Sequence, residues 1–373
     1  MNFFMRFLVL FGFAIVLSFI VTFFYRKLAT MFGWVDRPSE KKIHKKPIPT
    51  MGGICLFIVY WGVYYLGVPI ENQLNDVSAV FVGSFIILVT GIIDDLFELK
   101  PWQKMLGILL AANVFYFFTN TRLEHFILGF FGTVDFNPFI GYIVMMLWIA
   151  AITNSVNLMD GLDGLAVGSS TISLVTMGLV SYFFMDTTNV AIVVMIFLLV
   201  AVLVGFLPHN FYPAKIFLGD TGALFIGFMI AAMSLNGLKQ ATFMSLLVPV
   251  AILGVPITDT IAAVFRRLLN RQAISKKDWG HLHHRLLQLG FSHRQTVLVI
   301  YALGVIFSLT ALLYPLSSVL GSIILTVGLI FGVILFIASF NLLDSKDSTI
   351  RRLLQRGMTG DKHIEEKKDD TDS

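Results

Sequence analysis

The stretch 190–207, VAIVVMIFLLVAVLVGFL, decides the fold class of this chain because it contains neither a charged nor a hydrogen-bonding side chain. A helix that crosses a bilayer needs about 20 apolar residues, and this run approaches that length. Of the 373 residues, 57% are hydrophobic and 13% are charged, whereas a soluble domain carries roughly 25% charged residues. The chain is therefore predicted to be an integral membrane protein. Helices are expected because the ten-residue alternation of a membrane barrel is missing.

The same criterion predicts an all-α polytopic protein with about eleven transmembrane helices. The span at 105–118 is short, and the break between the last two spans depends mainly on Pro315. The predicted spans are 3–25, 48–67, 77–93, 105–118, 139–153, 164–185, 190–207, 217–236, 243–265, 296–314 and 317–340.

The basic residues orient these spans. With the N-terminus outside, only Arg6, Arg122 and Lys239 of the 27 Lys and Arg residues fall outside. Cytoplasmic loops carry the excess of Lys and Arg in membrane proteins, so the C-terminus is predicted to be cytoplasmic. Two regions follow: a transmembrane domain at 1–343 and a charged cytoplasmic tail at 344–373, which we expect to be disordered.

Other features exclude several classes of protein. The first apolar run ends at Arg26-Lys27 and has no A-x-A site, so it is predicted to be an uncleaved anchor. The single Cys55 excludes an intramolecular disulfide. Membrane lipids are expected partners. Nucleic acid is not, because no basic, aromatic-interleaved soluble module is evident.

Four polar clusters interrupt the apolar sequence, and all four fall on the predicted cytoplasmic side. A carboxylate that moves toward the bilayer centre costs about 2–3 kcal/mol, so four convergent clusters favour an active site over chance. The clusters are Asp94-Asp95, the run 154–164, the stretch 210–220 and the run 281–284.

Asp94 and Asp95 are adjacent carboxylates at the predicted end of the third span. Two such groups stay ionised in a partly dry site only beside a cation. They could therefore bind a divalent metal or face a phosphate; the structural alternative is a solvated helix end. Lys104 could hold a phosphate oxygen as a point charge, or extend its ammonium to the lipid headgroups.

The run N-S-V-N-L-M-D-G-L-D-G at 154–164 is the most specific of the four. Two Asn, two Asp and two Gly between apolar spans predict a compact polar loop. Gly161 and Gly164 permit positive φ and close approach to a ligand, and the amides and carboxylates could bind a base edge or ribose hydroxyls. A simple turn does not need this density, so a binding loop is favoured.

Asp220 begins a predicted helix, where an N-cap carboxylate is a sufficient structural explanation. A Mg²⁺ site is the competing interpretation, because this ion takes one or two protein carboxylates together with phosphate oxygens and water. The metal interpretation requires Asp94, Asp95 or the loop at 160–163 to lie nearby.

The run His281-Leu282-His283-His284-Arg285 lies in a long basic segment. It lacks the Cys partner or the H-E-x-x-H pattern that a zinc site would show. An anionic ligand such as a diphosphate or lipid headgroup is predicted, against nonspecific attraction to anionic lipid. In the basic segment 37–53, Pro-x-Pro before Gly-Gly predicts a shaped turn against a ligand or a neighbouring helix.

These motifs together resemble the polyprenyl-phosphate N-acetylhexosamine-1-phosphate transferases, glycosyltransferase family 4, which also include phospho-MurNAc-pentapeptide transferase. P-T-M-G-G, D-D, N-x-x-N-L-x-D-G-x-D-G-L, F-x-G-D-T-G and H-x-H-H carry the resemblance over nearly the whole chain. Eleven spans and H-L-H-H-R look like the bacterial undecaprenyl-phosphate GlcNAc-1-phosphate transferases, which begin wall teichoic acid, O-antigen and related polymers. The pentapeptide transferases usually have ten spans and a different histidine run.

The resemblance implies transfer of GlcNAc-1-phosphate from UDP-GlcNAc to undecaprenyl phosphate with release of UMP, dependent on Mg²⁺ or on Mn²⁺ in its place. It implies the bacterial plasma membrane and a cytoplasmic active site. Many relatives form homodimers, although the sequence specifies no interface. By motif position, the resemblance implies that Asp220 would bind the metal, Asp94 and Asp95 would be the catalytic pair beside the lipid phosphate, and Lys104 would hold phosphate.

The resemblance also implies the substrate-binding residues. The uridine pocket would be lined by Asn157, Asp160, Asp163 and Asn210. The diphosphate or sugar would be contacted by His281, His283, His284 and Arg285, of which His283 and His284 would also act in catalysis, and the substrate-binding set would be completed by Lys46 and Asn154.

Chemistry favours direct displacement. The second pKa of the lipid phosphate is near 6, by analogy with phosphorylated side chains, so a general base adds little, and neutralising two anions is the larger task. A covalent phosphoryl intermediate on Asp94 is the alternative mechanism. UDP-MurNAc-pentapeptide and UDP-GalNAc are the alternative donors. A cation-coupled transporter is a more distant alternative, because the acids lie at helix ends without paired discontinuous helices.

Overall fold

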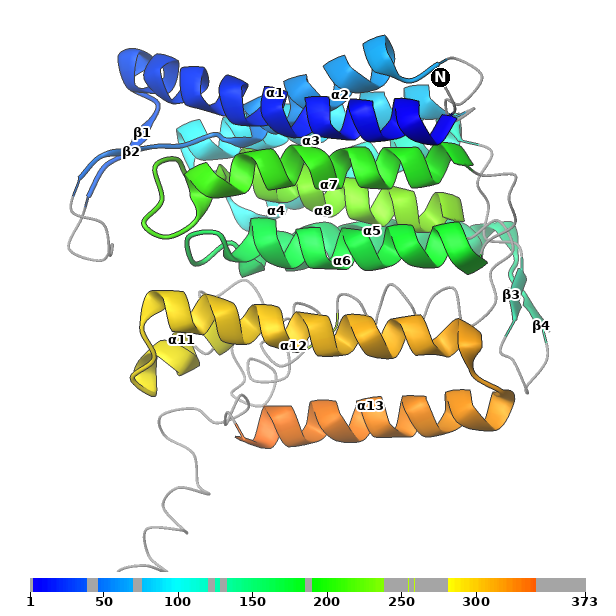
Figure 1. Ribbon diagram of the computed structural model, residues 1–373. Coiled ribbons are helices and arrows are strands. Elements are labelled where there is room, and N and C mark those ends of the chain that lie inside the picture. The colour runs from blue at the N-terminus through cyan, green and yellow to red at the C-terminus, as the bar shows by residue number, and fades with distance from the viewer. Residues whose placement is uncertain are drawn as a thin grey trace, which may run out of the picture.

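The computed structural model describes residues 3–38, 46–69, 76–119, 125–127, 133–184, 190–237, 254, 258 and 281–339. Within these ranges the chain is mostly helical, and the long helices run roughly parallel to one another (Figure 1). Six of the described helices are long and apolar enough to cross a membrane. This arrangement is that of a polytopic membrane protein.

Helices and two short antiparallel strand pairs make up the described chain. The pair β1–β2 aligns Val35 with Pro49 and lies at one end of the bundle, whereas β3–β4 lies at the other end (Figure 1). The elements are α1 (Phe3–Phe32), β1 (Val35–Asp36), β2 (Ile48–Pro49), α2 (Gly53–Gly67), α3 (Val77–Phe97), α4 (Pro101–Phe118), β3 (His125–Ile127), β4 (Thr133–Asp135), α5 (Pro138–Met159), α6 (Leu165–Phe184), α7 (Val190–Asn210), α8 (Gly219–Gly237), α11 (Leu282–Gln288), α12 (His293–Leu313), the 3₁₀ turn η4 (Tyr314–Leu316) and α13 (Val319–Ser339).

Each predicted span outside 243–265 coincides with one of these helices. The span 243–265 lies outside the described residues apart from Gly254 and Thr258, and so does the tail 344–373. The number of eleven spans and the sidedness of the termini therefore stay predictions. The predicted start of the second span at residue 48 is wrong, because Ile48 and Pro49 pair with β1 and the helix begins only at Gly53.

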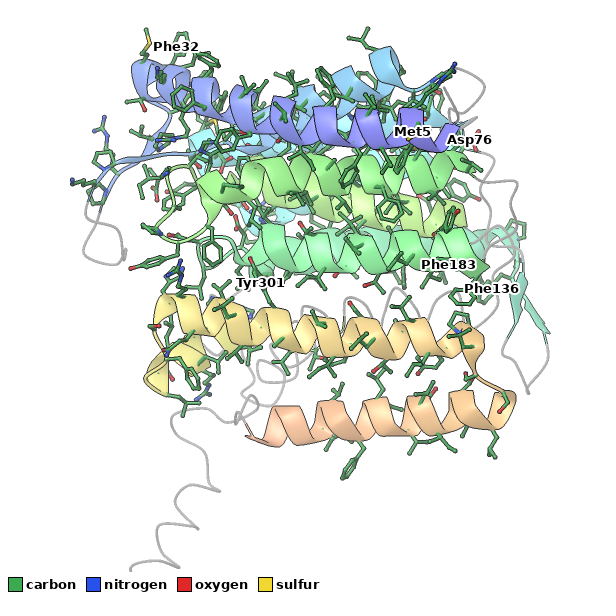
Figure 2. All side chains as sticks on the ribbon, viewed as in Figure 1. Met5, Phe32, Asp76, Phe136, Phe183 and Tyr301 are labelled. Atoms are coloured by element: carbon green, nitrogen blue, oxygen red, sulfur yellow. The ribbon has the colours of Figure 1, made fainter. Side chains whose placement is uncertain are left out.

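Helix α8 lies at the centre of the bundle and packs against α2, α3, α5, α6 and α7. From Ala223 to Met233 its side chains are apolar on every side, which is the pattern of a fully enclosed helix. Leu224, Phe225 and Phe228 are all completely buried. By contrast, α1 is peripheral, and its side chains Met5 and Phe32 are more than half exposed (Figure 2). These outer apolar faces suit contact with lipid.

Two glycines let α2 and α3 approach the start of α8 at backbone distance. A Cβ on Gly91 would lie 2.4 Å from Thr221 Cα, and a Cβ on Gly53 would lie 2.3 Å from the nitrogen of Gly222. Any larger residue at either position would force the helices apart. The start of α8 is therefore fixed by backbone contact with two other helices.

The segment before α2 pairs with the segment before α8. The N–H groups of Gly52 and Gly53 donate to the carbonyl oxygens of Phe217 and Leu218 over 3.1 and 3.2 Å. The N–H of Phe217 donates to the carbonyl oxygen of Pro49 over 2.8 Å. The predicted shaped turn at Pro-x-Pro and Gly-Gly is thus formed against this neighbouring segment and helix.

Gly91→Ala is expected to lower the thermal stability of the purified protein, because overpacking a tight contact costs about 1–3 kcal/mol. Gly62→Ala is the matched control, since a Cβ at Gly62 meets nothing within 4 Å. Thermal unfolding in detergent, followed by tryptophan fluorescence, measures both variants. Equal melting temperatures for the two would contradict the close approach of α3 and α8.

Candidate active site

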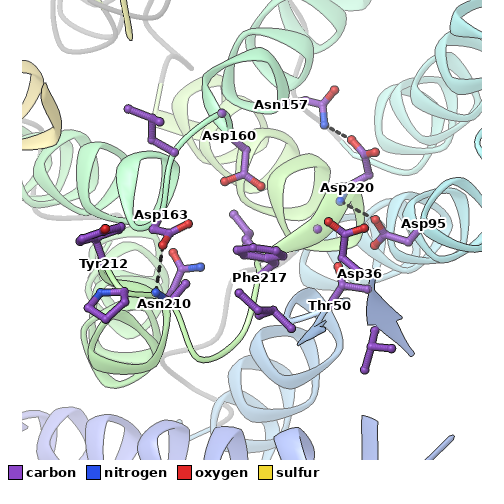
Figure 3. Close-up of a pocket in the computed structure, with 18 of the residues that line it drawn as sticks. Asp36, Thr50, Asp95, Asn157, Asp160, Asp163, Asn210, Tyr212, Phe217 and Asp220 are labelled. Carbon is purple, nitrogen blue, oxygen red and sulfur yellow. Dashed lines mark hydrogen bonds between the residues drawn. The ribbon is translucent and has the colours of Figure 1, made fainter. Parts of the chain in front are cut away.

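A cavity of about 680 Å³ opens at the end of the bundle that carries β1–β2 and α11. Its walls come from β1, α3, the α5–α6 connection, the α7–α8 connection and the starts of α8 and α12 (Figure 3). The predicted site residues that line it are Asp94, Asp95, Asn157, Asp160, Asp163, Asn210, Asp220 and His284. The structure therefore brings parts of all four polar clusters into one cavity.

The other predicted residues are not among those that line the cavity. Lys46 is exposed just before β2, and Asn154 lies one turn before Asn157 on α5. His281 and His283 are buried, and a Cβ on Gly161 would lie 2.4 Å from His283 Nε2. His283 thus packs directly over the backbone of the α5–α6 connection. Arg285 lies within α11. The basic residues of 259–280 lie outside the described part of the chain.

The compact polar loop predicted at 154–164 is wrong in its first half. Helix α5 continues to Met159, so Asn154 and Asn157 are helical and only residues 160–164 form the connection. On this last turn of α5, the side-chain amide of Asn157 donates to an Asp220 carboxylate oxygen at the start of α8. Gly164 has φ +79, as its predicted conformational freedom requires.

At one end of the cavity, the Lys104 ammonium lies between two carboxylates. Its Nζ is 2.9 Å from Asp220 Oδ1 and also forms an ion pair with Asp94 Oδ2. The same Nζ donates to Asn157 Oδ1 over 3.4 Å. One cation from α4 therefore joins α3, α5 and α8, and Lys104 does not extend to the headgroups.

Asp95 faces the start of α8 and accepts its first free N–H groups. Asp95 Oδ1 accepts the N–H of Asp220 over 2.9 Å, and Oδ2 accepts the N–H of Thr221 over 3.1 Å. The Thr221 hydroxyl also donates to Oδ2. Asp95 thus caps the helix from a different helix. Because Asp95 caps the helix, the carboxylate of Asp220 does not, and it accepts hydrogen bonds from Lys104 and Asn157 instead.

Around the acidic end of the cavity, carboxyl groups outnumber the one ammonium, that of Lys104, among the described residues. Burial, and then the charges of Asp220, Asp95 and Asp163, raise the pKa of Asp160 well above its usual value. No Lys or Arg lines the cavity within the described ranges. An added cation would relieve this repulsion.

The carboxylates fit a magnesium ion that is completed by substrate oxygens. Among the described residues, no group of three or more His, Cys, Asp or Glu side chains is placed to hold a metal by itself. Mg²⁺ commonly uses only one or two protein carboxylates and takes its other ligands from phosphate and water. Asp94 and Asp220, which already share one cation, match that pattern.

The opposite end of the cavity carries the Tyr212 ring, the Asp163 carboxylate and the Asn210 amide (Figure 3). Asp163 Oδ2 accepts the N–H of Ala214 over 2.9 Å. The Asn210 amide nitrogen donates to the carbonyl oxygen of Ile216, whereas its buried Oδ1 has no hydrogen-bond partner. Phe217 lies between this end and the acidic end. Asn210 Oδ1 is therefore an acceptor that a ligand donor could satisfy.

Sequence reasoning missed three residues of this wall: Tyr212, Phe217 and His293. Tyr212 and Phe217 lie within the stretch 210–220 that the sequence singled out, but an aromatic residue beside a membrane span carries no distinctive signal. His293 follows the N-cap Ser292, whose capping box with Gln295 explains the local sequence. Nothing in that pattern indicates that His293 reaches a loop 130 positions earlier.

Comparison with known proteins gives a consistent result. A family model described as Glycosyl transferase family 4 matches residues 77–238. A Bacillus subtilis protein named as a probable undecaprenyl-phosphate N-acetylglucosaminyl 1-phosphate transferase is 41% identical over 316 residues, covering 84% of this chain and 86% of that protein. A Mycobacterium tuberculosis decaprenyl-phosphate N-acetylglucosaminephosphotransferase is 33% identical over 77% of each chain. An Escherichia coli K12 undecaprenyl-phosphate alpha-N-acetylglucosaminyl 1-phosphate transferase is 28% identical over 74% of this chain and 76% of its own.

Asp95→Ala is expected to lower the free energy of unfolding by about 0.5–2 kcal/mol, the usual cost of losing an N-cap. Asp95→Asn should recover part of this loss, because its amide oxygen can still accept the N–H of Asp220. Thermal unfolding without added metal measures the effect. Glu98→Gln, an exposed acid on the same wall, is the control. Wild-type stability in Asp95→Ala would contradict the capping role.

Proposed function

Because this chain belongs to glycosyl transferase family 4, we propose that it transfers N-acetylglucosamine-1-phosphate from UDP-GlcNAc to undecaprenyl phosphate and releases UMP. The observation that carries the proposal is the Lys104 ammonium held between Asp94 and Asp220 at one end of a cavity, with Tyr212 and Asn210 at the other. The acidic end suits phosphate chemistry, and the opposite end suits a nucleoside. The names of the similar bacterial proteins support the donor and the acceptor.

The donor lies along the cavity with its uridine toward Asn210 and Asp163 and its diphosphate toward Asp220. Asn210 Oδ1, buried and without a partner, accepts a hydrogen bond from the base or the ribose. Asp160 lies between the two ends (Figure 3). The lipid phosphate enters beside Asp94, at the end of a helix that is apolar enough to lie in the membrane.

The reaction is a direct displacement at the sugar-bearing phosphorus. An oxygen of the lipid phosphate forms the new bond to this phosphorus, the bond to the bridging oxygen breaks, and UMP departs with that oxygen. The acceptor is largely dianionic at neutral pH because its second pKa is near 6, so no proton need be removed first. The main task of Lys104 is to neutralise charge and hold phosphate oxygens in line.

The position of Asp94 disfavours a covalent intermediate. One carboxylate oxygen accepts the N–H of Leu99 over 2.8 Å, and the other pairs with Lys104. The residue is only 5% exposed. Both oxygens are already engaged, which weakens Asp94 as a nucleophile toward phosphorus.

The metal expected for this reaction is Mg²⁺, with Mn²⁺ able to replace it. Asp220 would hold the ion, and Asp94 is the second carboxylate within reach of the same cation. The metal would add positive charge beside the diphosphate, which stabilises the developing negative charge on the leaving UMP. Asp95 contributes by fixing the backbone of Asp220.

The cellular setting is part of the proposal. We expect a bacterial plasma membrane enzyme whose cavity faces the cytoplasm, acting at the first membrane step of a cell-envelope glycopolymer such as wall teichoic acid or an O-antigen-like polymer. A homodimer is also expected by family analogy. UDP-GalNAc and UDP-MurNAc-pentapeptide remain the alternative donors.

UMP release by the purified protein tests the proposed reaction. With undecaprenyl phosphate and Mg²⁺, UDP-GlcNAc should yield UMP, whereas UDP-GalNAc and UDP-MurNAc-pentapeptide should not. Asp220→Asn should lower kcat/KM by about 100-fold or more, since it removes charge stabilisation at the reacting phosphates. Release from another donor would replace the substrate. Release from no donor by well-folded protein would contradict the enzyme assignment and favour a transporter.

Lys104→Met tests the shared cation without turnover. Removing the ammonium leaves Asp94 and Asp220 to repel each other, so the melting temperature without metal should fall, by a free energy of about 2 kcal/mol. Added Mg²⁺ should then stabilise the variant more than the wild type, because it restores the missing positive charge. Lys100→Met, at an exposed position four residues earlier, is the control. Equal Mg²⁺ shifts in Lys104→Met and wild type would contradict this account.

A further inference from the structure

We propose that His293 at the start of α12 is a positioning residue for the donor nucleotide. It holds the backbone of the 160–164 connection and backs the aromatic wall of the cavity, and so sets donor affinity rather than the rate of the chemical step. This inference rests on the proposed function, because it concerns the nucleotide end of the same cavity.

His293 is bonded to the connection that carries the two Asp-Gly pairs. The N–H of Asp163 donates to His293 Nε2 over 3.0 Å, while the side chain of Asp163 accepts the N–H of Ala214. Asp163 is thus fixed through its backbone by α12 and through its carboxylate by the α7–α8 connection. Its conformation depends on both contacts.

The ring of His293 also supports Tyr212. The two rings stack with centroids 4.4 Å apart and planes inclined by 24°. Both residues line the cavity, and Tyr212 is 40% exposed. An exposed aromatic ring backed by a second ring is a suitable surface for a planar base, since base–aromatic stacking contributes about 1–3 kcal/mol.

A second contact from α12 holds the far side of the same connection. The Tyr301 hydroxyl donates to the carbonyl oxygen of Gly164, and a Cβ on Gly168 would lie 1.9 Å from that hydroxyl oxygen. Figure 2 shows Tyr301 in the space between α12 and α6. Helix α12 therefore holds the connection at two points, Asp163 and Gly164.

These contacts place α12 in the donor site although it lies outside the matched family region, which ends at residue 238. His293 stacks on Tyr212, which lies at the opposite end of the cavity from Asp220 (Figure 3). A residue in this position acts on binding of the nucleotide, which is common to substrate and product. It does not touch the phosphorus that reacts.

The test compares His293→Ala and His293→Gln with wild type. Gln places an amide oxygen near the position of Nε2, where it can still accept the N–H of Asp163. His293→Ala should raise the KM for UDP-GlcNAc about tenfold, corresponding to the loss of one hydrogen bond and one ring contact. The turnover number and the KM for undecaprenyl phosphate should stay within about twofold. His293→Gln should recover the part of the donor affinity that the hydrogen bond supplies but not the part from the ring contact, and Tyr301→Phe should show a smaller rise in the same parameter.

Leu298→Ala is the matched control, because Leu298 lies on the exposed face of the same helix and should leave all constants unchanged. Binding of UMP alone, measured by calorimetry, should weaken in His293→Ala in parallel with the KM. An unchanged donor KM and UMP affinity in an active His293→Ala enzyme would overturn the inference. So would equal losses in turnover number and acceptor affinity, which indicate a general structural role. Absence of UMP release by wild-type protein would instead contradict the proposed function.

Discussion

The contact on which the site depends is the one cation, Lys104, that Asp94 and Asp220 share within an apolar helix bundle. Burying a charge without a partner costs several kcal/mol, and the buried carboxylate of Asp94 has Lys104 as that partner. Because Lys104 on α4 forms ion pairs with Asp94 on α3 and Asp220 on α8, these three helices contact one another through charged side chains at this point. The ammonium of Lys104 holds this arrangement together, and the carboxyl groups of Asp95 and Asp160 lie close to Asp220. Such a cluster is suited to bind a divalent cation and phosphates.

Asp220 is positioned by contacts that other helices make with the backbone of the first turn of α8. Gly53 and Gly91 admit α2 and α3 to backbone distance of the first turn of α8, and Asp95 accepts two of its free N–H groups. The neighbouring acids Asp94 and Asp95 therefore differ in role: Asp94 faces Lys104, and Asp95 fixes α8. Because a helix turns by 100° per residue, adjacent side chains face different neighbours.

Much of this could be predicted from the sequence, for identifiable reasons. Long apolar runs predicted the helices, because a bilayer leaves few alternatives, and clustered Asp and Asn predicted the cavity. The separate roles of Asp94 and Asp95 could not be predicted, since their sequence context is the same and only the position of α8 distinguishes them. The contact between Asn157, on the last turn of α5, and Asp220 also joins residues far apart in the sequence, so it could not be predicted. His293 was missed because its partner, Asp163, is distant in sequence and contributes only a backbone N–H.

The central claim is that the Asp94–Asp220 end of the cavity binds a divalent cation together with the donor diphosphate. Mn²⁺ in place of Mg²⁺ allows a direct measurement by electron–nuclear double resonance on the purified protein with UDP-GlcNAc. The account predicts a phosphorus coupling to the bound Mn²⁺, with Mn²⁺ affinity lowered about tenfold or more in Asp220→Asn, because an anionic ligand is lost. Unchanged Mn²⁺ affinity in that variant, or bound Mn²⁺ with no phosphorus coupling, would contradict it.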